Sequence, residues 1–330
     1  MSDHVTIPTP STSSMFIAGV DVTELARRRP PFTSLYLNGG PQPRERAHLA
    51  LDAAGAPNLH RILDAIDTTE LLASRAIFAA DDGPVVTFSI EEPLRHDVAR
   101  SGEVLSLGTL VEYSQFSSPH AVVTIEDDMF GVTSFGSVDV PGGGAHDAVG
   151  PVAVSQSVHT AIEQLGFVEP TLLALVGTGD QLERYAANFS DAFPHAWVQH
   201  YATDDLDDQL VDISDQIVRD AQSRAAETLT LELAQFRAAR DAGRVVEGPP
   251  VLDAVRRGGV ATLLVHDDAD DDRMVDGDRL VDHITHSAAR NNVPLRMIPN
   301  LGDGRGPAEG LGAVLAEDQA ATAAASPAAV

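Results

Sequence analysis

The arginines near the start of the chain form its densest group of positive charge. The group comprises Arg27, Arg28 and Arg29, with Arg44 and Arg46 beyond a predicted strand. A guanidinium group can bind a phosphate through two parallel hydrogen bonds, which suits contact with a nucleic-acid backbone. Ion pairing with Glu24 and Glu45 is the alternative, purely structural interpretation. We predict that these five arginines contact RNA.

A glycine-rich segment in the middle of the sequence is the second candidate. Gly142, Gly143 and Gly144 stand between a predicted strand and a predicted helix, and His146 and Asp147 follow. Glycines permit backbone conformations that are closed to other residues, and they let a backbone approach RNA closely. We predict that the three glycines and His146 contact RNA, and we assign no catalytic residue. A flexible connection with a solvated histidine is the alternative.

Three further patterns are typical of ligand sites but lack essential parts. The five aspartates at positions 267–272 lack the order of an EF-hand calcium loop, so a solvated acidic loop is expected. His283 and His286 lie three apart on a predicted helix without a third metal ligand at a fixed spacing, so we expect surface histidines. The segment 177–179, Gly-Thr-Gly, has no Walker lysine and predicts a tight turn. The sequence thus predicts neither a metal nor a cofactor.

The composition limits the classes of function. The 330 residues include 49 acidic and 22 basic side chains, and every basic one is arginine, which gives a formal charge of -27. Such a charge repels nucleic-acid phosphates at long range, so RNA binding would need local patches. The absence of cysteine excludes disulfides and thiolate chemistry. No apolar run reaches the length of a membrane helix, so we expect a cytoplasmic protein without a membrane partner.

The elements that would position these residues alternate between helix and strand. Hydrophobic spacing predicts a helix over 43–66 that breaks at 55–57, β-hairpins over 74–90 and 120–136, and one long helix over 206–242. Glycine and proline residues at 243–250 end that helix and mark a boundary. We therefore predict three domains of mixed α/β and α+β class, spanning residues 1–119, 120–247 and 248–330.

The third segment resembles a known family. GRVVEGPPVLDAVRRGGVATLLVHD at 243–267, SAARNNVPLRMIPN at 287–300 and EGLGAVL at 309–315 resemble bacterial relatives of archaeal and eukaryotic release factors and Pelota, including Balon-type ribosome hibernation factors. PPFTSLYLN at 30–38 and TLLALVGTGDQLERYAANF at 171–189 add weaker support. The resemblance implies a release-factor plan of three domains, whose C-terminal domain is similar to ribosomal protein L7Ae.

That resemblance implies a protein that functions by occupying a site on the ribosome. A Balon-type protein would enter the vacant ribosomal A site, contact rRNA and protect idle ribosomes under stress, with elongation factor Tu as a further implied partner. Release factors carry a Gly-Gly-Gln tip on the middle domain, and the matching segment here, 141–147, contains no glutamine. Hydrolysis of a peptidyl-tRNA ester is the alternative from the enzyme class. An acidic interaction protein that has lost RNA binding is the third possibility.

Overall fold

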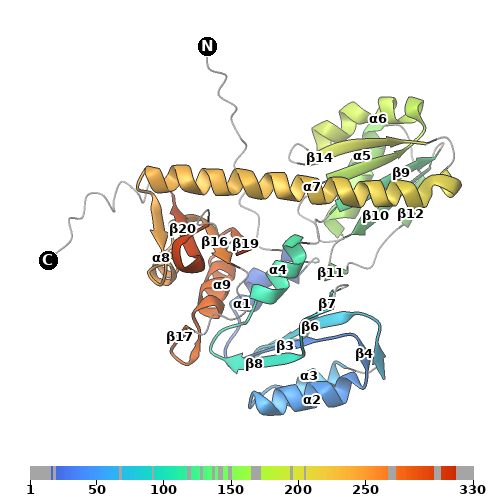
Figure 1. Ribbon diagram of the computed structural model, residues 1–330. Helices are drawn as coiled ribbons and strands as arrows, with labels where there is room; N and C mark the ends of the chain where they lie inside the picture. Colours follow the sequence, from blue (N-terminus) through green and yellow to red (C-terminus); the bar gives the residue numbers. More distant parts are fainter. Residues whose placement is uncertain are drawn as a thin grey trace.

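The computed structural model of the chain has three main β-sheets and one long helix that runs along two of them (Figure 1). It describes residues 16–17, 20–66, 69–90, 93–116, 120–126, 129–135, 138–139, 144–147, 151–164, 172–193, 196–203, 206–266, 273–300 and 306–316. The fold is mixed α and β, as the sequence predicts. Among these residues no helix combines the length and the apolar character that crossing a membrane requires.

The first sheet is antiparallel and has the strand order β11-β7-β6-β3-β8. Its strands are β3 (Phe32–Leu37), β6 (Ser74–Ala79), β7 (Val86–Ile90), β8 (Val98–Gly102) and β11 (Val138–Asp139). The predicted hairpin over 74–90 is confirmed as β6 and β7. Beside the sheet lie α1 (Val22–Ala26), α2 (Pro43–Ala53), α3 (Leu59–Asp64) and α4 (Gly108–Phe116). We call this sheet and its four helices the first unit.

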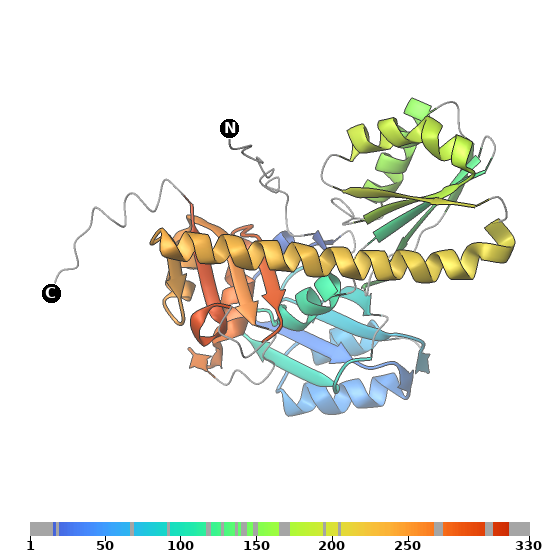
Figure 2. The ribbon, with the colours of Figure 1, turned by 45° about the horizontal axis from the view of Figure 1, so that its top comes forward.

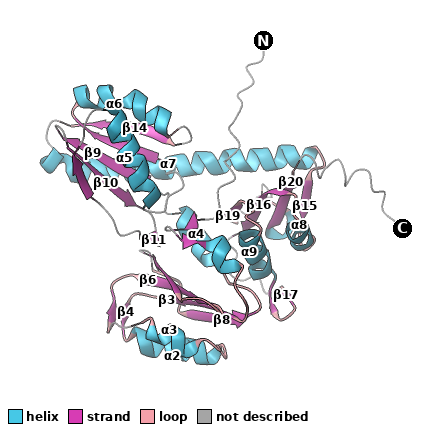
Figure 3. Cartoon of the chain, turned by 180° about the vertical axis from the view of Figure 1, so that it is seen from behind, coloured by secondary structure: helices cyan, strands magenta, loops and turns pink. Residues whose placement is uncertain are grey.

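The side chains of β3 alternate between two separate cores, one on each face of the first sheet. Leu35 and Leu37 pack with α2 and α3, which cover the outer face seen in Figure 3. Phe32 and Tyr36 point to the opposite face and join a second core that includes residues of the C-terminal segment. A strand alternates its side chains between the two faces of a sheet, and here both faces are buried. The predicted break between α2 and α3 is also confirmed.

The middle sheet has the order β12-β10-β9-β13-β14. Its strands are β9 (His120–Glu126), β10 (Met129–Phe135), β12 (Gly144–Asp147), β13 (Leu172–Gly177) and β14 (Trp197–Ala202). The predicted hairpin over 120–136 is confirmed as β9 and β10. One core lies between this sheet and the helices α5 (Pro151–Gln164) and α6 (Gly179–Ala192). Thr178 caps α6 through a capping box with Gln181, so the predicted tight turn also starts a helix.

The third sheet has the order β15-β20-β16-β19. Its strands are β15 (Val245–Glu247), β16 (Val260–His266), β19 (Leu295–Ile298) and β20 (Leu311–Leu315). The helices α8 (Val251–Arg257) and α9 (Leu280–Arg290) cover one face. This sheet and these two helices are called the third unit. The remaining short elements are β1 (Phe16–Ile17), β2 (Val20–Asp21), β4 (Gly40–Pro41), β5 (Glu70–Leu71), β17 (Met274–Val275), β18 (Asp278–Arg279) and η1 (Ala308–Gly310).

The long helix α7 (Leu206–Asp241) confirms the predicted element and connects the middle and third sheets (Figure 2). Ile217 and Ala221 pack on the face of the middle sheet that α5 and α6 leave open. Leu233 and Phe236, further along the helix, pack on the free face of the third sheet. A 36-residue helix is about 54 Å long at 1.5 Å per residue. This length lets one element bury apolar surface in two separate cores.

Candidate nucleic-acid interface

Arg27, Arg28 and Arg29 directly follow α1, which packs against α9 of the third unit. The Nε of Arg27 donates a hydrogen bond to the carbonyl of Arg290 at 3.2 Å. A guanidinium nitrogen of Arg28 donates to the carbonyl of Pro84 at 2.8 Å. Arg29 is held through its backbone, whose N–H donates to a carboxylate oxygen of Asp82 at 2.9 Å. The three arginines thus lie where the first and third units meet.

The C-terminal ends of three helices converge at this place. The side-chain nitrogen of Asn291, just after α9, donates to the carbonyl of Val255 in α8 at 3.0 Å, which joins the ends of these two helices. The bond between Arg27 and Arg290 joins the end of α1 to the same point. Each end carries arginines, and together they form what we call the arginine surface: Arg27, Arg28, Arg29, Arg256, Arg257 and Arg290.

The arginine surface is accessible to a ligand. Five of its six side chains are exposed, and Arg28 is half-buried. The guanidinium groups of Arg29, Arg257 and Arg290 make no hydrogen bond or ion pair with any residue that the structure describes. Cations at helix C-termini are favoured by the helix dipole, so the three helix ends tolerate this density of positive charge. The carboxylate of Asp82, which accepts from the backbone N–H of Arg29, borders the surface.

Arg44 and Arg46 lie at the other end of β3, where α2 begins. Six residues of strand separate the two groups, a distance of about 20 Å at 3.3 Å per residue. Arg46 is tied into the fold, since it donates to a carboxylate oxygen of Asp97 at 2.7 Å and to the carbonyl of Asn38 at 2.8 Å. Arg44 is exposed, and its guanidinium donates to the carbonyl of Leu63. The structure therefore does not bring the five predicted arginines into one cluster.

The glycine segment is only partly covered by the structure. Gly142 and Gly143 lie outside the described residues. Gly144 and His146 were expected in a loop, but they belong to β12, where they pair with Val132 and Phe130 of β10. That expectation is wrong for 144–147 because an antiparallel ladder engages this backbone. Contact of these residues with RNA stays a prediction.

His283 and His286 are buried, which corrects the expectation of surface histidines. They are only 4% and 6% exposed. The Nε2 of His283 lies 2.8 Å from the carbonyl oxygen of Val275, and its Nδ1 lies 3.2 Å from a guanidinium nitrogen of Arg256. His283 thus helps to hold a member of the arginine surface in place. The acidic segment 267–272 lies outside the described residues.

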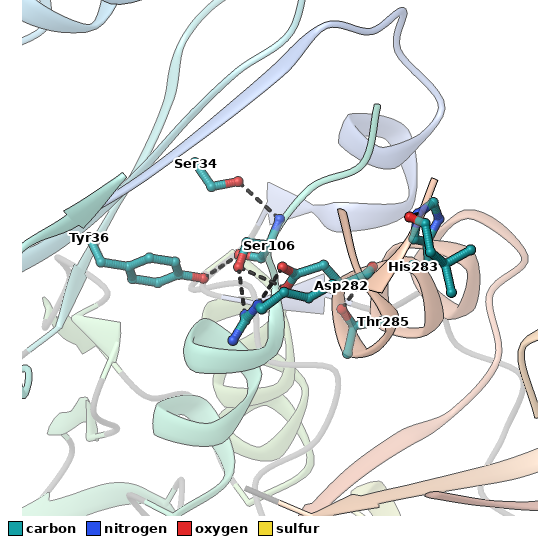
Figure 4. A network of polar contacts seen from close by, with 8 residues as sticks. Ser34, Tyr36, Ser106, Asp282, His283 and Thr285 are labelled. Carbon is teal, nitrogen blue, oxygen red and sulfur yellow. Dashed lines mark hydrogen bonds and ion pairs between the residues drawn. The ribbon is translucent and has the colours of Figure 1, made fainter. Parts of the chain in front are cut away.

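A buried polar network fixes the first unit against α9 and thereby positions the arginine surface (Figure 4). The hydroxyl of Ser106 donates to a carboxylate oxygen of Asp282 at 2.8 Å. Arg279 donates to both oxygens of the same carboxylate, at 2.8 and 2.9 Å. The backbone N–H of Ser106 donates to the hydroxyl of Ser34 at 3.0 Å, so the network reaches β3.

Two titratable groups in this interface are held neutral by burial. The hydroxyl of Tyr36 donates to the carbonyl of Ser106 at 2.6 Å, and burial raises the pKa of this phenol far above its usual value. The Nδ1 of His286 accepts a hydrogen bond from the backbone N–H of Leu105 at 3.2 Å, and its ring lies 5.2 Å from that of Phe32. Burial, with Arg290 and His283 as further causes, lowers the pKa of His286 to about 4.

The RNA-binding residues predicted from the sequence did not include Arg256, Arg257 or Arg290. The signal that could have identified them is positional. Each lies in the last turn of an amphipathic helix of the third unit. Their meeting with Arg27, however, depends on a contact across 263 residues of sequence, which local patterns do not encode.

Comparisons with known proteins give likenesses to translation factors. Neither a family model nor a curated protein matches the chain. Among solved structures, ribosome-bound archaeal Pelota and ABCE1 aligns over 93% of this chain and 97% of that chain, at 15% identity and a TM-score of 0.42. Dom34 of Saccharomyces cerevisiae, a translation termination-like factor that interacts with Hbs1, aligns over 89% and 91%, at 10% identity and a TM-score of 0.41. The archaeal termination factor aRF1 aligns over 89% and 95%, at 16% identity and a TM-score of 0.24.

Proposed function

We propose that this chain is a ribosome-binding homologue of translation factors, built on the release-factor and Pelota plan, that acts as a hibernation factor in the vacant A site. The three predicted domains, 1–119, 120–247 and 248–330, with an L7Ae-like third domain, belong to this proposal. So do the cytoplasmic location and delivery by elongation factor Tu. The proposal rests on the motifs at 243–267, 287–300 and 309–315 and on the arginine surface. The low structural likenesses carry no part of it.

The observation that carries the RNA-binding part is the convergence of six arginines in a protein of charge -27. Helix ends from two units contribute to this surface, so a phosphate backbone that crosses the interface would contact both. Arg44 at the other end of β3, and the segment 142–146, are proposed as separate points of contact. Since the fold uses the guanidinium of Arg46 internally, this residue would act by holding α2 in place.

The first test is co-sedimentation of the full chain with ribosomes after charge reversal. Arg29→Glu, Arg257→Glu and Arg290→Glu change groups without a side-chain partner among the described residues, so the fold should persist. The matched control reverses three exposed arginines elsewhere, Arg184, Arg219 and Arg237, and makes the same change in net charge. Each phosphate contact that is lost lowers the slope of log affinity against log salt by about one.

We expect the arginine-surface variant to lose at least about tenfold in ribosome affinity, with a shallower salt slope, while the control variant keeps the slope of the parent. Equal losses in the two variants would show that only net charge matters, and the proposed interface would be abandoned. Cryo-electron microscopy of the complex then tests the A-site part. Density elsewhere on the ribosome would contradict that part.

A further inference from the structure

A small cavity lies between the first and third units, near the start of α4. Its volume is about 90 Å³. Its lining includes four cationic or titratable nitrogen-bearing side chains of the first unit and its loops or of β16, together with Glu112 and Arg279: Arg95, His96, Arg100, Glu112, His266 and Arg279. The cavity lies at the N-terminal end of α9, about 16 Å along that 11-residue helix from Arg290 of the arginine surface. It is therefore a second site, separate from the proposed RNA interface.

The sheet register explains why cationic side chains face this cavity. Arg100 pairs with Ser34 and Val98 with Tyr36 across β8 and β3. Directly paired residues share one face of a sheet, and Tyr36 faces the third unit, so Arg100 does as well. Arg95 and His96 precede β8 and are exposed at the same place.

The charge balance favours an anion. Three arginines, Arg95, Arg100 and Arg279, line the cavity, and Glu112 is the carboxylate among the lining residues. Asp282 offsets the charge of Arg279 through two hydrogen bonds. The balance stays positive in a chain whose net charge is -27, before any contribution from His96 or His266.

The start of a helix and the ends of two strands add to this preference for an anion. Gly108 and Thr109, in the first turn of α4, line the cavity, and a helix N-terminus favours negative charge. His266 and Met297 come from the carboxyl ends of the parallel strands β16 and β19, the edge at which open α/β sheets bind ligands. A Cβ atom on Gly306 would lie 2.5 Å from Nε2 of His266, so the neighbouring turn encloses this ring closely.

The volume limits what the cavity can hold. The volume of about 90 Å³ is several times the roughly 10–15 Å³ that a cavity needs to hold one water molecule. That space suits one tetrahedral oxyanion, with the rest of a larger ligand outside the mouth. We propose that the cavity binds the phosphate group of a small phosphate monoester, held by Arg95, Arg100 and the first turn of α4. Because His266 of the third unit also lines the cavity, the ligand would contact both units.

Isothermal titration of the full chain with inorganic phosphate and with adenosine monophosphate tests this proposal. Arg95→Gln removes an exposed cation without a partner among the described residues, and we expect at least a tenfold loss of affinity.

Gly108→Asp is the second variant, since a Cβ at this position meets no atom within 4 Å. Its carboxylate would stabilise the start of α4 but repel the anion. Arg184→Gln, on α6, is the control and should bind as the parent does.

Each outcome decides the proposal. Binding of both phosphates that falls in the two cavity variants and not in the control supports it. Absence of binding, or equal binding by all variants, overturns it. A short RNA without terminal phosphates forms a third arm, because it offers only phosphodiesters. Binding of that RNA alone, sensitive to Arg95→Gln, would assign the cavity to an RNA backbone and also overturn the small-molecule proposal. Ribosome association of the Arg29, Arg257 and Arg290 variant is a separate measurement, so either proposal can fail alone.

Discussion

Replacing Asp282 by alanine tests whether the buried network holds the first and third units together. The carboxylate of Asp282 accepts two hydrogen bonds from Arg279 and one from Ser106. The side chains of this ion pair are only 14% and 5% exposed. Asp282→Ala would therefore leave the guanidinium of Arg279 in a buried position without its counter-charge.

The expected cost follows from that arrangement. Removal of one partner from a buried ion pair costs about 3–5 kcal/mol, a large part of the 5–15 kcal/mol that typically stabilises a native protein. An exposed pair gives the comparison. Arg224 and Glu227 on α7 are 44% and 69% exposed, and Glu227→Ala should cost less than about 1 kcal/mol.

Urea unfolding measured with two probes is the assay. Far-UV circular dichroism follows all helices and strands, while the fluorescence of Trp197, the single tryptophan, follows the middle sheet and the part of α7 that packs on it. We expect Asp282→Ala to lower the free energy of unfolding seen by circular dichroism and to leave the Trp197 transition nearly unchanged. A loss below about 1 kcal/mol would refute the argument that the network is essential to this interface.

A double variant separates the two causes of the loss. Asp282→Leu with Arg279→Met removes both charges and keeps apolar volume, which is often neutral for a buried pair. The double variant should therefore be more stable than Asp282→Ala. If it is equally unstable, the cost arises from lost packing, and the explanation based on the unpaired charge is wrong.

Two further predictions concern other buried positions. Because the pKa of His286 falls from 6.5 to about 4 on folding, the unfolded chain binds the extra proton, and stability should fall as the pH drops from about 6.5 to about 4. The loss is roughly 3 kcal/mol, and a pH series of urea midpoints should show it in the parent but not in His286→Gln. Gly312→Ala would place a Cβ atom 2.5 Å from the ring of Phe236, so we expect a loss of about 1–3 kcal/mol. Gly179→Ala, whose Cβ would have no neighbour within 4 Å, should change the urea midpoint little; equal effects would contradict the packing argument.

Periodic patterns predicted the elements that pack within one segment. The hairpins over 74–90 and 120–136, the break between α2 and α3 and the length of α7 all follow from local spacing and turn residues. α4, β8 and the start of α5 at Pro151 were not predicted. β8 carries Arg100 and Ser101 among five half-buried residues, so it lacks a clear alternation.

The burial of the histidines on α9 could not be predicted from the sequence, because it depends on contacts between distant segments. α9 was expected to expose His283 and His286, as an amphipathic helix on a single sheet would. In the structure α1 and α8 also pack against it, and the chain at Leu105 and Ser106 reaches it from the first unit. Asp282 and His286 of α9 are buried with partners from a segment distant in sequence, and the periodicity of the helix alone cannot show this.

The use of arginine as the sole basic residue connects the fold to the proposed function. A guanidinium group has five donors in a planar fork, whereas an ammonium group is a point charge. The chain uses this geometry inside the first unit, where Arg46 bonds Asn38 and Asp97 together and Arg61 donates to the carbonyl of Ala80 at 2.6 Å. Arginines engaged in this way stabilise loops in a protein whose acidic excess repels itself. The arginines left exposed at the ends of α1, α8 and α9 supply a local positive surface on a protein whose net negative charge repels phosphates. Such a surface favours a partner that presents phosphates at one defined place and disfavours non-specific binding of RNA.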